Sequence, residues 1–140
     1  MVSPPPAAST PLIRARMASQ RRKDTAPEMA LRRALHARGL RYRVDVPVVG
    51  TRRRGDLVFK SAKVVVFVDG CFWHGCPQHG TIPKRNASWW AEKIAANVRR
   101  DRDTDRILTQ RGWAVVRVWE HESTGDAVRR VFRVVRSRLG

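Results

Sequence analysis

The spacing of apolar positions changes along the chain, and each spacing predicts an element. Apolar residues three or four apart predict helices, and short apolar runs between turn residues predict strands. The predicted segments are a helix over 25–39, strands over 41–44, 55–59 and 63–68, a helix over 88–111, a strand over 114–119, and a closing helix through Val128, Val131, Phe132, Val135 and Leu139. This order predicts an α/β fold with helices packed on a sheet.

Local signals support these elements. Thr25 to Glu28 has the form of a capping box, with Pro27 in the first turn, and Gly39 ends the helix. The run 63–68 is apolar on both faces, as expected of a central strand.

The chain length of 140 residues suits one domain with one core. Residues 1–20 lack periodic apolar positions and predict a flexible basic arm that orders on DNA. Residues 21–140 are therefore expected to form a single domain, acting as a monomer.

Positive charge dominates the composition. Lys and Arg number 29 against 12 Asp and Glu, a formal net charge of +17, which predicts a polyanionic partner. The basic residues are spread along the chain, as expected of a surface that follows duplex DNA. Those assigned to the DNA backbone are Arg14, Arg16, Arg21, Arg22, Lys23, Arg52, Arg53 and Arg54.

A membrane is not the expected partner. The longest apolar run, 64–68, is too short to span a bilayer, and residues 1–11 lack the apolar core of a secretory signal. We expect a cytoplasmic, nucleoid-associated protein whose cysteines stay reduced.

Residues 70–87 form a long aperiodic segment in which function is expected. Cys71, Cys76 and His79 lie within it, and His121 follows a strand end, which gives the number and type of ligands that structural zinc prefers. The alternative is two buried thiols and two surface histidines. We favour zinc, because so long a loop in a small domain needs a staple.

Two carboxylates are predicted at one edge of the sheet. Asp56 opens the second strand and Asp69 ends the third, so both could hold the hard cation that phosphodiester hydrolysis requires. The alternative makes each a turn residue, with Asp56 paired to a nearby arginine.

A general base is predicted near these carboxylates. His74 is not needed for zinc and could deprotonate water, while Asp101, on the inward stripe of the long helix, could orient its imidazole. The alternative is a solvated His74 and an Asp101 paired with an arginine. Glu28 is fully explained by its capping box.

Aromatic side chains gather in the same region. Phe72 and Trp73 are adjacent in the loop, and such apolar wedges can unstack base pairs. Trp89 and Trp90 open the long helix, and at least one of them should pack in the core.

Taken together, the motifs resemble those of the very-short-patch repair (Vsr) endonucleases, over roughly residue 14 to the C-terminus. They read, in order, KDTAPE from Lys23, GDLVF from Gly55, VFVDGCFWHGCP from Val66, WAEKI from Trp90 with Asn97 and Asp101, and VWE from Val118. The ordered series is far more specific than any one of them.

The resemblance implies a restriction-endonuclease-like fold of the PD-(D/E)xK type, a mixed sheet flanked by helices with structural zinc. It implies a magnesium-dependent enzyme that nicks duplex DNA 5′ of the thymine in a T:G mispair. Asp56 would be the metal ligand with the Val68 backbone carbonyl, His74 the base, Asp101 its orienting partner and Glu28 a holder of water at the metal. The implied DNA intercalators are Phe72, Trp73 and Trp90.

The chain departs from the family pattern at three places. Some members have Thr-His where this chain has Val68-Asp69, so the water-binding role of that histidine passes to Asp69, which could instead strengthen the metal site. The zinc ligands vary among members, so Gln78 and His74 compete with His79. The loop before Asp56 reads Arg-Arg-Arg-Gly, where a proline commonly precedes the aspartate.

Two alternatives to the mismatch-directed nicking enzyme stay open. One is a zinc-stapled DNA-binding module without catalysis, and the combination of Asp56, His74 and Asp101 argues against it. The other is a nicking or restriction enzyme with a different recognition rule.

Overall fold

The chain is described from a computed structural model, which covers residues 25–71, 74–77 and 82–139. The predicted arm 1–20 lies outside these residues. The elements are α2 (Ala26–Ala37), β1 (Arg43–Pro47), β2 (Arg54–Phe59), β3 (Val64–Asp69), α3 (Ala87–Gln110), β4 (Ala114–Trp119) and α4 (Thr124–Leu139). Their order matches the order that the apolar spacing predicts.

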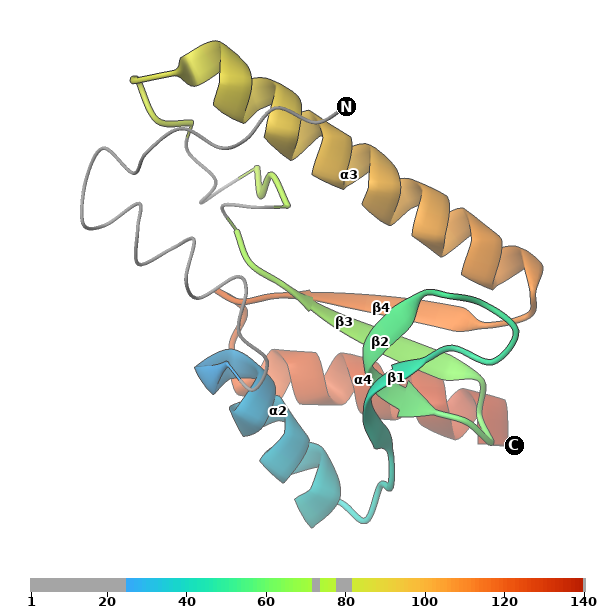
Figure 1. The fold of residues 1–140 in the computed structure, drawn as a ribbon. Coiled ribbons are helices and arrows are strands. Elements are labelled where there is room, and N and C mark those ends of the chain that lie inside the picture. The colour runs from blue at the N-terminus through green and yellow to red at the C-terminus, as the bar shows by residue number, and fades with distance from the viewer. Residues whose placement is uncertain (1–24, 72–73, 78–81, 140) are drawn as a thin grey trace.

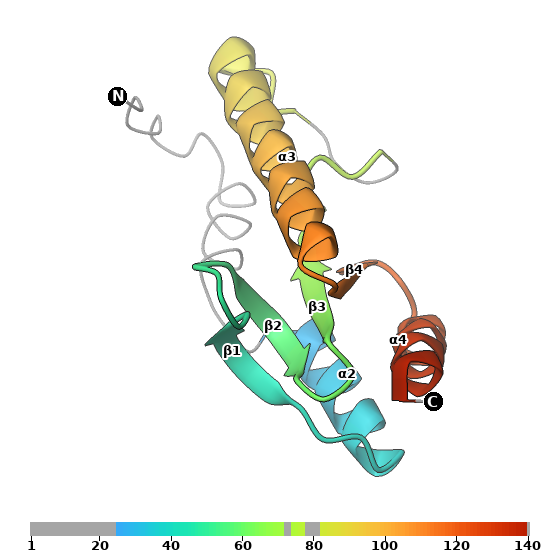
Figure 2. The ribbon, with the colours of Figure 1, turned by 90° about the vertical axis from the view of Figure 1, so that its right-hand side faces the viewer.

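The four strands form one mixed sheet in the order β1-β2-β3-β4. The pairs β1–β2 and β2–β3 are antiparallel, and β3–β4 is parallel, with α3 as the crossover between them. Helices α2 and α4 cover one face of the sheet and α3 covers the other (Figures 1 and 2). This is the mixed α/β architecture expected from the sequence.

Two apolar layers hold these faces. On the α2 and α4 face, side chains of both helices meet alternate residues of β2, β3 and β4, such as Leu57, Val66 and Val118. On the opposite face, Val65 and Phe67 pack with Leu108 of α3. Because β3 supplies both layers, it is buried on both sides, as the unbroken apolar run of the central strand predicts.

The first strand differs from its prediction. The sequence predicts a strand over 41–44, followed by a loop rich in Pro, Gly and Arg. The structure places β1 at Arg43–Pro47, with Asp45 at a positive φ of 50°. The outermost position in the sheet explains this, since an edge strand tolerates a proline whose nitrogen has no proton to donate.

No helix in the described ranges is long and apolar enough to cross a membrane.

Gly55 gives a test of packing between the central strands. A Cβ added at Gly55 would lie 2.3 Å from Cγ2 of Val65, a fully buried residue, and 3.0 Å from Cγ2 of Val58. We therefore expect Gly55→Ala to lower the free energy of unfolding by about 1–3 kcal/mol, because neither valine has room to move. Guanidinium unfolding followed by circular dichroism measures the change.

Gly125→Ala is the matched control. The nearest atom to its added Cβ, a nitrogen of Arg129, is 3.5 Å away, and Gly125 lies in the first turn of α4. This variant should keep or raise stability, by less than about 1 kcal/mol. An equal response of the two variants would show that the Val65 contact is not the cause.

Candidate active site

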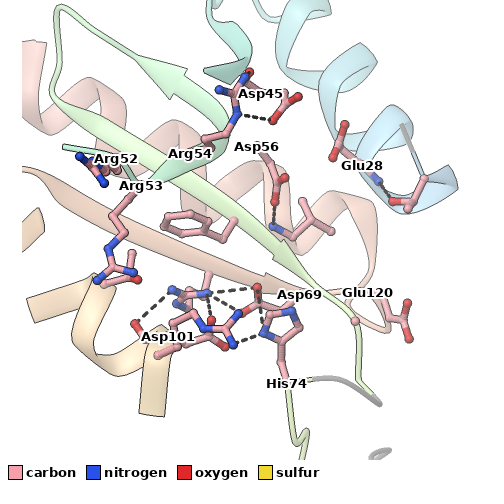
Figure 3. A pocket seen from close by; sticks show the side chains of 17 residues that line it. Glu28, Asp45, Arg52, Arg53, Arg54, Asp56, Asp69, His74, Asp101 and Glu120 are labelled. Atoms are coloured by element: carbon pink, nitrogen blue, oxygen red, sulfur yellow. Dashed lines mark hydrogen bonds and ion pairs between the residues drawn. The ribbon is translucent and has the colours of Figure 1, made fainter. Parts of the chain in front are cut away.

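A pocket of about 440 Å³ opens where β2, β3 and β4 approach α3 and the start of α2 (Figure 3). Side chains from seven separate parts of the chain line it. They include Glu28 from α2, Asp45 from β1, Arg52, Arg53, Arg54 and Asp56 around the start of β2, Asp69 from β3, His74 from the following loop, Arg100 and Asp101 from α3, and Arg117 and Glu120 from β4 and its end. The proposed metal ligand and the proposed base thus face one cavity.

Asp56 lies where β2 and β3 separate. The last backbone pair on this side is Leu57 with Val66, and beyond it the Asp56 Oδ2 accepts the Val68 N–H at 2.7 Å. The side chain therefore replaces a ladder hydrogen bond that would otherwise be lost. No ion pair joins Asp56 to a basic side chain within the described residues.

This setting raises the pKa of Asp56 from 3.8 to about 6. Burial is the main cause, the Val68 hydrogen bond opposes it, and the charges of Glu28, Asp69 and Asp45 add to it. A buried carboxylate near like charges binds a cation in preference to remaining unneutralised, so the site has the electrostatics of a metal ligand.

The Val68 carbonyl is directed to the same place. In a strand, the N–H and C=O of one residue point to the same side, and those of the next residue point to the other. The Asp69 carbonyl accepts the Glu120 N–H at 2.9 Å, on the β4 side. Since the Val68 N–H reaches Asp56 on the β2 side, the Val68 carbonyl also faces Asp56.

These oxygen donors fit Mg²⁺, which prefers one or two carboxylates completed by water and phosphate oxygens. Glu28 is buried, with 6% of its surface exposed, and lies beyond Asp56 on the same wall of the pocket (Figure 3). Among the described residues, Asp56 is not part of a group of three side chains close enough to ligate an ion by themselves. A metal here would use Asp56, the Val68 carbonyl and water.

On the wall opposite Asp56, the His74 imidazole faces Asp101. The imidazole Nδ1 lies 2.5 Å from the Asp101 Oδ2 and 3.8 Å from the Asp69 Oδ1. Burial alone would lower the pKa of His74, but the Asp101 hydrogen bond and the Asp69 charge outweigh it, so the pKa is raised. The 27-residue separation along the chain is closed by folding α3 back over the sheet.

Asp69 ends β3, and its carboxylate receives hydrogen bonds from Nη1 of Arg117 at 3.1 and 3.0 Å. Burial raises its pKa, and His74 and Arg117 oppose that rise. Asp69 therefore has Arg117 as its cationic partner among the described residues, and its role in binding water or metal stays a prediction.

Arg117 is a site residue that the sequence pattern did not single out. It is the arginine within the otherwise apolar strand 114–119, and a charged residue in such a strand needs buried partners. That rule was a usable signal, although it could not have named Asp69, Asp101 and Asp105 as the partners.

A second cluster lies at the start of the loop. Sγ of Cys71 is 3.2 Å and Sγ of Cys76 3.7 Å from Nδ1 of His121, and both thiols are buried. Burial and the neighbouring Cys76 raise the pKa of Cys71 to about 12. Binding of a metal cation such as zinc would remove the proton of this thiol. Three of the four predicted ligands therefore meet with the donor set that zinc prefers. His79 and its competitor Gln78 lie outside the described residues.

The predicted DNA contacts are only partly described. Around the start of β2, Arg53 pairs with Asp103 of α3 at 3.1 Å and Arg54 with Asp45 at 3.2 Å, so carboxylates hold both at the pocket. Further predicted DNA-binding side chains lie outside the described residues. They are Arg14, Arg16, Arg21, Arg22, Lys23, Phe72 and Trp73.

Trp90 does not fit its implied role as an intercalator in this conformation. Its side chain is 2% exposed and packs with Ile94 and, edge to face, with Trp89. Intercalation would require Trp90 to leave this packing. The expectation that at least one of the two tryptophans packs in the core is confirmed.

Comparisons with known proteins find relatives that are nucleases by name. The sequence profile of a family described as DNA mismatch endonuclease Vsr matches residues 10–79. The chain is 50% identical over 115 residues to the type II nicking enzyme V.NaeI of Lentzea aerocolonigenes, which covers 80% of this chain and 69% of that protein. It is 43% identical over 111 residues to the type II nicking enzyme V.XorIIP of Xanthomonas oryzae pv. oryzae, covering 76% and 77%. It is 39% identical over 103 residues to the DNA mismatch endonuclease Vsr of Escherichia coli, covering 70% and 62%.

The raised pKa of Asp56 predicts a pH-dependent gain in stability for Asp56→Asn. The ionised carboxylate costs stability at pH values above about 6, and the cost disappears as the pH falls toward 3.8, where the unfolded state also takes up the proton. Asparagine is neutral and can still accept the Val68 N–H. We expect Asp56→Asn to raise the free energy of unfolding by about 1–2 kcal/mol at pH 8 without divalent metal, and by almost nothing at pH 4.

Urea unfolding at the two pH values measures this difference. Asp103→Asn is the control, since Asp103 is 41% exposed and pairs with Arg53 and Arg106. Its removal should leave stability at pH 8 unchanged or slightly lower. A destabilised Asp56→Asn at pH 8 would be evidence that Asp56 is not a strained carboxylate.

Proposed function

The chain belongs to the Vsr family of DNA mismatch endonucleases, and on that premise we propose that it is a magnesium-dependent enzyme that nicks one strand of duplex DNA 5′ of the thymine in a T:G mispair. The observation that carries this proposal is the shared pocket. Asp56, with its raised pKa, and the hydrogen-bonded pair of His74 and Asp101 line opposite walls of one cavity.

The two walls suit the two requirements of phosphodiester hydrolysis. A magnesium ion supplies charge neutralisation at the phosphate when bound, and Asp56 with the Val68 carbonyl would hold it. With Nδ1 of His74 engaged by Asp101, the other ring nitrogen is left to accept a proton from water. Glu28, buried on the Asp56 wall, would hold and orient water there.

Charge and position suit a DNA substrate. The net charge of +17 attracts the polyanion, and Arg52, Arg53 and Arg54 line the pocket beside Asp56. All the proposed catalytic groups come from one chain, so a monomer would suffice. A chromosomal substrate would also place the enzyme in the cytoplasm.

A second recognition rule is favoured by the relatives. V.NaeI and V.XorIIP are both named type II nicking enzymes, whereas the Escherichia coli relative is named a mismatch endonuclease. Nicking of a fully paired site is therefore the second candidate function. Family membership and the complete set of Asp56, His74 and Asp101 disfavour a DNA-binding module without catalysis.

A nicking assay separates these candidates. We expect wild-type protein with Mg²⁺ to nick the thymine strand of a T:G duplex, and Asp56→Asn and His74→Ala to lower the single-turnover rate by about 10²- to 10⁴-fold, because each removes a group required in the transition state. Denaturing gels measure the products.

The control variant is Arg129→Met, which removes a positive charge from an exposed site on α4 and should nick at nearly the wild-type rate. Equal nicking of the T:G duplex and its T:A counterpart would favour the second candidate. Nicking that survives both active-site substitutions would contradict the assignment of this pocket.

Zinc binding is a separate prediction. We propose that Cys71, Cys76 and His121 hold one structural Zn²⁺, with a fourth ligand from the loop, His79 being the first choice. Cys76→Ser should reduce bound zinc, measured by mass spectrometry of the purified protein, from about one ion per chain to well below half. It should also lower the melting temperature, because the loop loses its staple.

Ser61→Ala serves as the control, since Ser61 lies in the exposed turn between β2 and β3, and it should retain zinc. If both variants are free of zinc and equally stable, the zinc proposal is wrong and the two thiols are simply buried.

A further inference from the structure

Arg117 projects from β4 toward α3. Its neighbours along the strand, Val116 and Val118, belong to the apolar layer on the α2 and α4 face, so by alternation Arg117 faces the other way. Its guanidinium lies over the ring of Phe67, 4.4 Å from the centroid. The side chain is 22% exposed, so it is fixed within the wall of the pocket.

The guanidinium donates to three aspartates. Nε bonds both carboxylate oxygens of Asp105 at 2.9 and 3.0 Å, and Nη1 bonds both oxygens of Asp69 at 3.1 and 3.0 Å. Nη2 reaches the Asp101 backbone carbonyl at 3.3 Å and an Asp105 oxygen at 2.7 Å. With its five N–H groups directed at these acceptors, Arg117 has none left for a DNA phosphate.

The contacts of Arg117 determine which carboxylate can bond His74. Asp69, His74 and Asp101 have ligand atoms within 4.8 Å of one another, a spacing that would suit a metal ion. The cation in this cluster is already present, because Arg117 pairs with Asp69 at 3.0 Å, lies 3.7 Å from the Asp101 Oδ1 and holds the Asp101 backbone carbonyl. The Asp101 Oδ2 is left to bond the imidazole at 2.5 Å, while Asp69 stays at 3.8 Å.

The backbone of Arg117 is fixed as well. Its carbonyl accepts a hydrogen bond from Nη2 of Arg130 at 2.7 Å, and Nη1 of Arg130 pairs with Glu122 at 2.5 Å. Glu122 in turn accepts the Trp119 N–H at 3.0 Å. Contacts on the α4 side therefore fix the end of β4, while the guanidinium of Arg117 binds the aspartates on the α3 side.

We propose that Arg117 is a positioning residue that takes the place of a metal ion between Asp69 and Asp101 and so keeps His74 hydrogen-bonded to Asp101 and not to Asp69. This inference rests on the proposed function, in which His74 is the general base. Arg117 itself does not touch the substrate.

The test compares Arg117→Met with Arg129→Met, which makes the same change at an exposed site on α4. We expect Arg117→Met to lower the single-turnover nicking rate on the T:G duplex by about 100-fold, the lower limit for losing an oriented base. Its dissociation constant for the duplex, measured without Mg²⁺, should stay within about 3-fold of the Arg129→Met value, because both lose one charge.

Two further variants distinguish positioning from general damage. Arg117→Lys keeps the charge but loses the planar fork, so it should recover part of the rate, to about 10-fold below wild type. The double variant His74→Ala/Arg117→Met should nick about as slowly as His74→Ala alone, because Arg117 acts through His74. Additive losses, or an Arg117→Met enzyme as fast as Arg129→Met, would overturn the inference.

A spectroscopic measurement tests the role of Arg117 independently of nicking activity. In the magnesium-free protein, the ring N–H proton that His74 shares with Asp101 should give a far-downfield proton NMR signal, assigned by its loss in His74→Ala. The signal should persist in Arg129→Met and shift or vanish in Arg117→Met. An unchanged signal in Arg117→Met would overturn the inference.

Failure of the proposed function can be told apart from failure of the proposal for Arg117. If wild type does not nick, or His74→Ala nicks normally, the proposed function fails and the NMR comparison alone decides the role of Arg117. If Arg117→Met does not fold by circular dichroism, Arg117→Lys decides, since it must show both a slower rate and a shifted signal.

Discussion

The arrangement of this protein depends on one hydrogen bond, in which the Asp56 carboxylate accepts the Val68 N–H at 2.7 Å. It forms where β2 and β3 stop pairing, and it satisfies a backbone group that would otherwise be buried without a partner. The same bond fixes a carboxylate and a carbonyl side by side at the open edge of the sheet. No basic side chain of the described residues pairs with Asp56, and burial raises the pKa of its carboxyl to about 6.

The two walls of the pocket handle buried negative charge in different ways. On the β2 wall, burial is the main cause of the raised pKa of Asp56, and the charge of Glu28, which itself pairs with Arg32 at 3.3 Å, adds to it. On the α3 wall, the single guanidinium of Arg117 donates to both oxygens of Asp69 and of Asp105. Asp56 thus lacks a cationic partner among the described residues and suits an external cation, whereas Asp69 and Asp105 share an internal one, which separates a metal-binding role from a proton-transfer role within one cavity.

The loop after β3 links the two candidate centres. His74 lies between Cys71 and Cys76 in sequence, and the Cys76 N–H bonds the Cys71 carbonyl at 3.0 Å. The Cys71 N–H is in turn held by Glu120 at 3.1 Å, at the end of β4. A metal at the cysteines would therefore act on the site through the backbone, by fixing the segment that presents His74, and would need no contact with the substrate.

The sequence by itself determined the order of the elements, the central position of β3 and the carboxylates, thiols and histidines that meet, because periodicity, turn residues and ligand chemistry are local properties. It misplaced the limits of β1, since only the edge position makes Asp45 and Pro47 acceptable in a strand. Tertiary structure alone decided that Asp69 faces Arg117 and that Trp90, not Trp89, is the buried tryptophan of the pair. Those outcomes depend on which face of β3 and β4 meets α3, and the free energy that selects among such pairings comes from the packing of distant segments, which no local pattern encodes.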